Sequence, residues 1–282
     1  MEEEKWEDAD DTVKSKATNK DAVTIAGAVL LGCLIISGTL AYVSARGVKI
    51  MGQVGGTEVA ANQADSQQPD AVKVSIDEIK ALFTDKNIMF GKKDSKILFV
   101  EFSDPSCPFC QVASGKNPEL NKQAGAQFTM EKDGGTYLPP VPEMKKLVDS
   151  GKAAYVWLYA NGHGNGELGT KALYCAKEKG KFWEAHDLLM SAAGYDLMNN
   201  TVKNDVAKSG DMANFLKNAV KVDDMKKCLE SGKYDDRIAG DMAIAQKIGF
   251  RGTPSFFVNT TNFAGAYSYK DMMSVVEEAL KK

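Results

Sequence analysis

The feature that most limits the fold of this chain is a pair of cysteines directly behind a buried strand. Ile97 to Phe102 is an almost continuous apolar run, interrupted only by Glu101, as expected for a central strand of a sheet. Asp104 and Pro105 end the run, and Cys107-Pro108-Phe109-Cys110 follows where a helix is able to begin. This placement sets the chemistry expected of the two thiols.

Cys107 is expected in the first turn of that helix, where unpaired backbone N–H groups and the helix dipole favour its thiolate. Cys107 is therefore the candidate nucleophile. Cys110 lies one turn further along the same face, so it can close or reopen a disulfide with Cys107. In a central strand, Glu101 would be buried with a raised pKa and could accept the proton of the second thiol. In an edge strand, Glu101 would merely face water.

Charge is unevenly spread over the 282 residues, whose formal net charge is −3. Residues 1–21 form an acidic tail with eight acidic residues and four lysines, so the remaining residues sum to about +1. A nucleic-acid-binding protein would present a basic face, which this balance does not provide. No nucleic-acid partner is therefore expected.

Residues 22–45 are 24 consecutive uncharged positions, long enough for a helix to cross the roughly 30 Å core of a bilayer. We predict a transmembrane helix. A cleaved signal is an alternative, although no clear exit site precedes Arg46, and so is a lipid-bearing Cys33. Four lysines before the span weakly favour a cytoplasmic N-terminus. Two cysteine pairs beyond the span agree with an oxidising compartment, so a single-pass protein of the cell membrane with an extracytoplasmic catalytic domain is expected.

Residues 46–72 are expected to be a flexible linker, because they are rich in Gly, Gln, Ala and Asp without apolar periodicity. Residues 73–282 are expected to form one α/β domain with a parallel pair of strands and a helical insertion at about 165–248. The other predicted elements are a capped helix from Ser75, a small hairpin joining Phe128–Met130 to Thr136–Leu138, a helix end at Lys145–Ser150, strands at Ala153–Tyr159, Ser255–Asn259 and Phe263–Ala266, and a helix from Ser268.

Thr253 and Pro254 directly precede the predicted strand that starts at Ser255. A proline at the start of a strand cannot donate to the ladder, so either an edge position or a cis bond is expected. The backbone of this dipeptide could then face the helix that carries the two cysteines.

In their order along the chain, these elements resemble the DsbA-like branch of the thioredoxin superfamily over roughly residues 73–282. The resemblance implies a thioredoxin fold in which Cys107 attacks substrates and Cys110 resolves the mixed disulfide. Glu101 matches the buried acid, Pro108-Phe109 the active-site dipeptide, and Thr253-Pro254 the cis-proline loop that pairs with substrate backbone. This chain departs from the family in two places: residues 115–140 break the long first helix, and Phe109 replaces a histidine.

Cys175 and Cys228 both fall in the helical block, and some DsbA-like proteins that look similar here carry a second, structural disulfide. Two unpaired buried thiols are the alternative, because sequence gives no distances. His163, His186 and these cysteines are too widely spaced for structural zinc, so no metal is expected.

The sequence thus predicts a membrane-tethered thiol:disulfide oxidoreductase that acts on the thiols and disulfides of exported proteins. Its redox-active disulfide would serve without any cofactor. The resemblance also implies a membrane partner, linked to quinones, that recycles the site. Two alternatives stay open, a disulfide reductase or isomerase and a peptide-binding holdase in which the cysteines are incidental. The reduction potential of the Cys107/Cys110 couple separates the first alternative from an oxidase.

Overall fold

The computed structural model of the protein describes residues 73–281. The predicted acidic tail, the transmembrane helix at 22–45 and the linker at 46–72 therefore lie outside the described residues. Within residues 73–281, no helix combines the length and the apolar character needed to cross a membrane.

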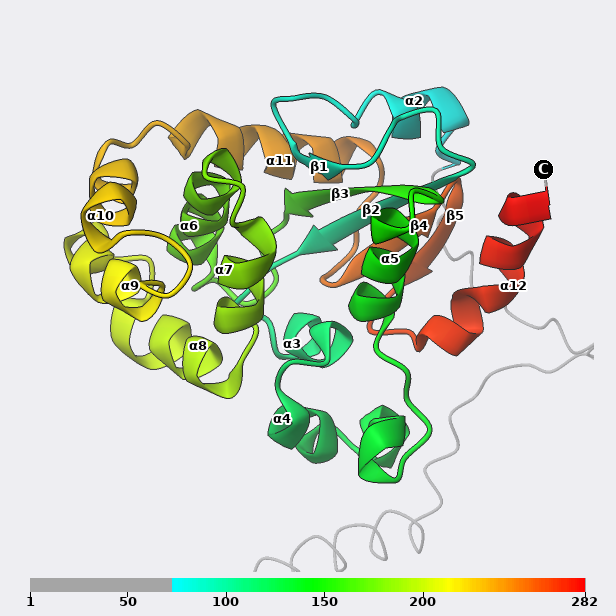
Figure 1. Ribbon diagram of the computed structural model, residues 1–282, viewed down its shortest axis with the longest axis horizontal. Coiled ribbons are helices and arrows are strands. Elements are labelled where there is room, and N and C mark those ends of the chain that lie inside the picture. Colours follow the sequence, from blue (N-terminus) through cyan, green and yellow to red (C-terminus); the bar gives the residue numbers. More distant parts are fainter. Residues whose placement is uncertain (1–72, 282) are drawn as a thin grey trace, which may run out of the picture. The chain divides into compact units, whose positions relative to one another are not determined.

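Five strands form one mixed sheet in the order β1-β3-β2-β4-β5 (Figure 1). The central pair β2 and β3 is parallel, as predicted, whereas every other neighbouring pair is antiparallel. Because β2 has partners on both sides, the prediction of a central strand around Glu101 is confirmed. The strands are β1 (Ile88–Phe90), β2 (Ile97–Ser103), β3 (Ala153–Tyr159), β4 (Ser255–Val258) and β5 (Thr261–Ala264).

Both faces of the sheet are covered, which explains why β2 and β3 are apolar almost throughout. Side chains such as Phe99 and Trp157 pack into a large core with the helical block and helices α5 and α12. Their neighbours Leu98 and Val156 point to the opposite face, where they meet α2 and α11. In Figure 1, α2 and α11 lie above the sheet.

Helices account for most of the other residues within 73–281, and the helical block predicted at about 165–248 is present as α6 to α11. The first helix, α2, opens with the predicted capping box at Ser75 and Glu78. The helices are α2 (Ile76–Lys80), α3 (Pro108–Ser114), α4 (Pro118–Gln123), α5 (Pro140–Asp149), α6 (Glu167–Glu178), α7 (Phe182–Leu189), α8 (Ala192–Asp196), α9 (Ser209–Phe215), α10 (Val222–Glu230), α11 (Asp235–Lys247) and α12 (Tyr269–Lys281). The structure also describes three-residue 3-10 helices, η1 (Ala126–Phe128), η2 (Glu131–Asp133) and η4 (Val206–Lys208), and a six-residue π-helix, η3 (Leu197–Val202).

The structure corrects the sequence analysis at three elements. The hairpin predicted around residues 128–138 is wrong in its form. Asp133 and Gly135 donate to the carbonyl of Met130 and wind the segment into the helical turn η2, and Met130 pairs with Tyr137 in an isolated parallel bridge. The last strand begins at Thr261 rather than near Phe263. The strand β1 was missed, since three residues are too few to show a period and only pairing with β3 defines them.

Candidate active site

Cys107 lies at the end of β2, at the residue that caps the N-terminus of α3. Its backbone N–H donates to the carbonyl of Asp104 at 2.9 Å, and its own carbonyl accepts from Gln111 at 3.1 Å. Sequence reasoning placed Cys107 in the first turn, and the structure places it one step earlier. Its side chain is nearly buried, whereas Phe109 beside it is 43% exposed. A partner protein would therefore meet this corner of the molecule first at Phe109.

The pKa values of the two thiols are shifted in opposite directions. The pKa of Cys107 falls from its ordinary value of 9.0 to about 6, chiefly because the thiol of Cys110 donates to its sulfur. Burial opposes this shift, while the Thr253 side chain and the backbone N–H groups at 109 and 110 assist it. Burial raises the pKa of Cys110, and the neighbouring sulfur raises it further. The pair therefore consists of a thiolate-forming Cys107 and a neutral Cys110.

The Thr253–Pro254 dipeptide faces the nucleophile. The peptide bond before Pro254 is cis, and β4 lies between β2 and β5, so the edge-strand alternative is wrong. The sulfur of Cys107 lies 3.5 Å from the carbonyl oxygen of Thr253. Gly162 also lies close to this loop, since a Cβ there would lie 1.6 Å from the hydroxyl oxygen of Thr253, so a side chain at position 162 would collide with Thr253.

Glu101 is fully buried beneath the thiols, which excludes the edge-strand alternative for this residue too. The hydroxyl of Tyr155 donates to its Oε2. Burial raises the pKa of Glu101, although Tyr155 and the Ser103 hydroxyl partly offset the rise. Ser103 also acts to lower the pKa of Cys110, so Glu101 and Cys110 both lie near Ser103.

Asp104 was read from the sequence only as the end of a strand, yet it organises the loop that carries the cysteines. Its Oδ1 accepts from the backbone N–H of Ser106 at 2.8 Å and from the Ser106 hydroxyl at 2.7 Å. Its Oδ2 accepts from the backbone N–H groups of Gly162 and His163, both at 2.9 Å. Its own N–H donates to the sulfur of Cys110 at 3.4 Å. No sequence signal announces this role, because the partners at 162 and 163 are remote along the chain.

Gln111 is a second residue that sequence reasoning missed. Its side-chain amide is buried and donates to the carbonyls of Pro105 at 2.9 Å and Leu189 at 3.0 Å. Its Oε1 accepts from the amide of Asn117 at 3.4 Å. These bonds join α3 to the end of α7, so the helical block fixes the helix that carries Cys110.

Comparison with known proteins agrees with this architecture. A family model described as Thioredoxin matches residues 142–278, which begin after both cysteines of the site. The crystal structure of alpha-DsbA1 from Wolbachia pipientis has a TM-score of 0.52 and 17% sequence identity to this chain, and the match covers 72% of this chain and 96% of that one. The chain contains a thioredoxin-like domain.

Curated relatives of the thioredoxin-like domain differ in length. Disulfide bond formation protein D of Bacillus subtilis is 22% identical over 199 residues, which are 68% of this chain and 77% of that protein. Na(+)/H(+) antiporter NhaA 3 of Salinispora tropica is 25% identical over 208 residues, which are 72% of this chain and 26% of that protein. The chain therefore spans about a quarter of the length of the antiporter that it matches.

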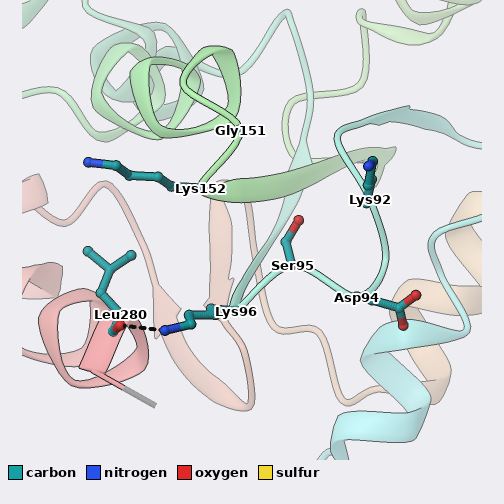
Figure 2. A pocket seen from close by; sticks show the side chains of 7 residues that line it. All are labelled: Lys92, Asp94, Ser95, Lys96, Gly151, Lys152 and Leu280. Atoms are coloured by element: carbon teal, nitrogen blue, oxygen red, sulfur yellow. Dashed lines mark hydrogen bonds between the residues drawn. The ribbon is translucent and has the colours of Figure 1, made fainter.

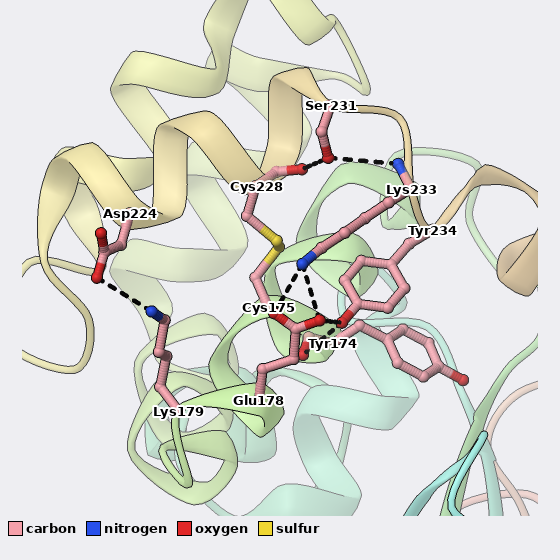
Figure 3. The surroundings of a disulfide bond; sticks show 9 residues. All are labelled: Tyr174, Cys175, Glu178, Lys179, Asp224, Cys228, Ser231, Lys233 and Tyr234. Carbon is pink, nitrogen blue, oxygen red and sulfur yellow. Dashed lines mark hydrogen bonds and ion pairs between the residues drawn. A yellow bond between two sulfur atoms is a disulfide. The ribbon is translucent and has the colours of Figure 1, made fainter.

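A disulfide joins Cys175 in α6 to Cys228 in α10, inside the helical block of the thioredoxin-like domain (Figure 3). The Cα atoms are 6.1 Å apart, whereas the residues are 53 positions apart in sequence. Figure 3 shows an ion pair on each side of the bond, Lys179 with Asp224 and Lys233 with Glu178. The disulfide links α6 to α10, a contact that could not be predicted from the sequence alone.

Replacing both Cys175 and Cys228 with serine is expected to lower the free energy of unfolding by about 4 kcal/mol, the chain-entropy value for a loop of this length. Urea unfolding of the oxidised proteins measures the change. The reactivity of Cys107, which lies outside the loop, serves as the control. An unchanged urea midpoint would contradict a stabilising role for this bridge.

One pocket of the thioredoxin-like domain, of about 500 Å³, lies where β2 and β3 begin, whereas the two cysteines follow the end of β2 (Figure 2). Lys92, Lys96 and Lys152 line it; Lys92 lies apart from the other two in Figure 2, and the amino group of Lys96 donates to the carbonyl of Leu280. Among residues 73–281, no cluster of metal-ligating side chains is found.

Proposed function

We propose that the protein is a membrane-tethered thiol:disulfide oxidoreductase of the DsbA type. In this proposal the thioredoxin-like domain exchanges disulfides with exported proteins through Cys107 and Cys110. The observation that carries it is the opposite acidity of two neighbouring thiols, one ionised near pH 6 and the other held neutral. Exchange needs a thiolate that attacks and leaves readily, together with a second thiol that can resolve the adduct.

The contacts of Cys107 support its assigned step. A substrate thiolate attacks the sulfur of Cys107 in the oxidised site, and the electron pair of the broken bond stays on Cys110. Cys110 then takes a proton from Glu101, which also lies near Ser103. The exposed ring of Phe109 and the backbone of Thr253 are available to the substrate chain on either side of the reacting sulfur.

The decisive experiment is a titration of Cys107 by its rate of alkylation with iodoacetamide in the reduced full chain. We expect a midpoint near pH 6, because the thiol of Cys110 donates to the Cys107 thiolate. In a Cys110→Ser variant, alkylation of Cys107 is measured without any contribution from Cys110. A midpoint no lower than that of a free cysteine, about 8.5, would remove the basis of the proposal.

The lowered pKa of Cys107 also makes the stability of the reduced protein depend on pH. Between about pH 6 and the ordinary value of 9.0, the unfolded reduced chain binds more protons at Cys107 than the folded chain does. The contribution of this thiolate to the stability of the reduced protein is therefore complete above pH 9 and is lost as the pH falls through 6. Comparison with a Cys107→Ser variant shows how much of the pH dependence of stability requires this thiol, including its effect on Cys110.

The direction of exchange is tested by the reduction potential of the couple at equilibrium with glutathione. A value near the roughly −120 mV of DsbA supports an oxidase, and one near the roughly −270 mV of thioredoxin supports a reductase. Chaperone activity that survives loss of both thiols would instead favour the peptide-binding holdase.

Tethering is proposed from residues 22–45 and their uncharged composition. A membrane-impermeant maleimide added to intact cells is expected to label Cys107 when the domain is extracytoplasmic. Labelling only after lysis would oppose this orientation. The membrane partner that returns the site to its oxidised form is proposed on family resemblance.

A further inference from the structure

The helical block meets the loop that carries the cysteines at Ser106, the residue directly before Cys107. Ser106 is fully buried, and its N–H and hydroxyl both donate to Asp104. On the other side, the Ser106 hydroxyl accepts from the backbone N–H of Asn165 at 3.2 Å, and the Ser106 carbonyl accepts from the side-chain amide of Asn199 at 3.2 Å. Every polar group of Ser106 is therefore bonded, and two of its partners belong to the helical block.

The amide of Asn199 is itself held in one orientation. Its Nδ2 also donates to the carbonyl of Tyr195 at 3.1 Å, and its Oδ1 accepts from the side-chain amide of Asn165 at 3.1 Å. A flipped amide would place its oxygen against two carbonyls and its NH₂ group against another NH₂ group. Asn165 and Asn199 thus form one connected unit that reaches the residue before the nucleophile.

The backbone around η3 fixes the place of Asn199. This helix is of the π type, which is rare and occurs frequently at functional sites. It is followed by Lys203 and Asn204, whose φ angles of 46° and 64° are uncommon for residues with side chains. The side chain of Asn204 accepts from the N–H of Leu168 at 3.1 Å and donates to the carbonyl of Gly164 at 2.7 Å. Such a strained backbone persists only where surrounding contacts determine it, and here those contacts tie η3 to the start of α6.

Two more side chains of the helical block lie close to the thiols. Met190, at the end of α7, is buried in one cluster with Cys107 and Cys110. Burial, and then the charge of Cys107, raise the pKa of Tyr195 in α8 above its ordinary value of 10.0. Burial also raises the pKa of Cys110 in α3. Both neighbours are therefore uncharged where Cys107 titrates, so a changed titration of Cys107 in an Asn199 variant reports a changed position of its sulfur.

We propose that Asn199 is a positioning residue of the thiol site, which holds the Ser106–Cys107 peptide so that the Cys107 sulfur lies against the N–H groups at the start of α3. The proposal rests on the thiol chemistry proposed above. Cys107 caps α3 with φ −76° and ψ 128°. Rotation of the peptide before it changes φ and moves the sulfur away from the N–H groups at 109 and 110 and from the thiol of Cys110. The bond from Asn199 opposes this rotation, because the buried carbonyl of Ser106 would lose its partner.

The test measures the pH midpoint for alkylation of Cys107 by iodoacetamide in the reduced full chain, together with the melting temperature of each variant. Asn199→Leu keeps a side chain of similar size and removes the hydrogen bonds of the amide. Asn165→Leu leaves Asn199 in place and removes the donor that orients it. Asn200→Leu is the matched control, since Asn200 is an exposed residue of the same helix whose amide donates to Asp196 at 2.7 Å.

We expect the midpoint to rise by about one pH unit in Asn199→Leu and by less in Asn165→Leu, with no change in Asn200→Leu. In the double variant, the rise should not exceed that of Asn199→Leu alone, because the two amides act as one unit. A second readout is the equilibrium in which the oxidised site and two glutathione molecules give the dithiol and glutathione disulfide. At pH 7 it should move by about fivefold toward the oxidised site in Asn199→Leu, because the thiolate of the reduced site is less stabilised.

A lower melting temperature in Asn199→Leu with a wild-type midpoint and a wild-type glutathione equilibrium would overturn the proposal, because Asn199 would then be only structural. A wild-type midpoint no lower than that of a free cysteine would instead refute the proposed function, whatever the variants show. Should Asn199→Leu fail to fold, Asn165→Leu decides the matter, and an unchanged midpoint in that variant overturns the positioning role.

Discussion

Replacing Cys107 with serine is expected to lower dithiol oxidation by about a thousandfold or more, because no other described thiol both ionises near pH 6 and adjoins a resolving cysteine. The measurement is the rate at which the oxidised full chain converts a peptide dithiol into its disulfide. Cys110→Ser is expected to behave differently, since its Cys107 still attacks but nothing resolves the adduct. That variant should accumulate mixed disulfides that mass spectrometry detects and reductant reverses.

Both variants are expected to fold, so their activities can be compared directly. Both keep the Cys175–Cys228 bridge, which lies in the helical block, so both are expected to stay folded. Serine replaces sulfur by a smaller atom without adding volume. Equal residual activity in the two variants, or adducts that form on Cys110 instead of Cys107, would contradict the assigned roles.

Replacing Asp104 with asparagine is expected to destabilise the reduced protein by about 3 kcal/mol or more, although the side chains have the same shape. The two carboxylate oxygens accept from four donors, and three of these are backbone N–H groups that cannot reorient. Either orientation of an asparagine amide aims its NH₂ group at a backbone N–H. Thermal unfolding measures the loss of stability.

The same variant should change the chemistry of the site. Asp104 holds both cysteines through its backbone, accepting from Cys107 and donating to the sulfur of Cys110. We expect the alkylation midpoint of Cys107 to move up toward that of a free cysteine in Asp104→Asn. Asp133→Asn, at an exposed position, is the matched control, and Ser106→Ala should give a milder effect because its N–H remains bound. An Asp104→Asn protein with wild-type stability and midpoint would show that the network is unimportant.

Local patterns predicted much of the fold because they report strong local preferences. Two apolar runs, one through Glu101 and one at Ala153–Tyr159, were predicted as strands and form β2 and β3. Strands that are buried on both faces need apolar side chains at nearly every position. The capping signal at Ser75 likewise located α2. The hairpin expected near Gly134 failed because a helical turn satisfies the same backbone groups there, and the choice depends on contacts outside the segment.

The candidate site, like the fold, was predicted only in part from the sequence. Cys107, Cys110 and Glu101 could be identified from the sequence, because thiol spacing and a lone carboxyl in an apolar strand are visible without coordinates. Their acidities were only partly foreseen, since the largest influence on Cys107 is the thiol of Cys110 rather than the helix end.

The order of residues along the chain by itself determined most of the strands and helices and which two thiols lie one helical turn apart. The reason is that period, capping and turn preferences act over a few neighbouring residues. Only the tertiary structure decided that Asp104 bonds to residues 162 and 163 and that Cys175 meets Cys228. Those contacts join positions far apart in sequence, and they form only because the helical block packs onto the sheet and buries the groups that must then find partners.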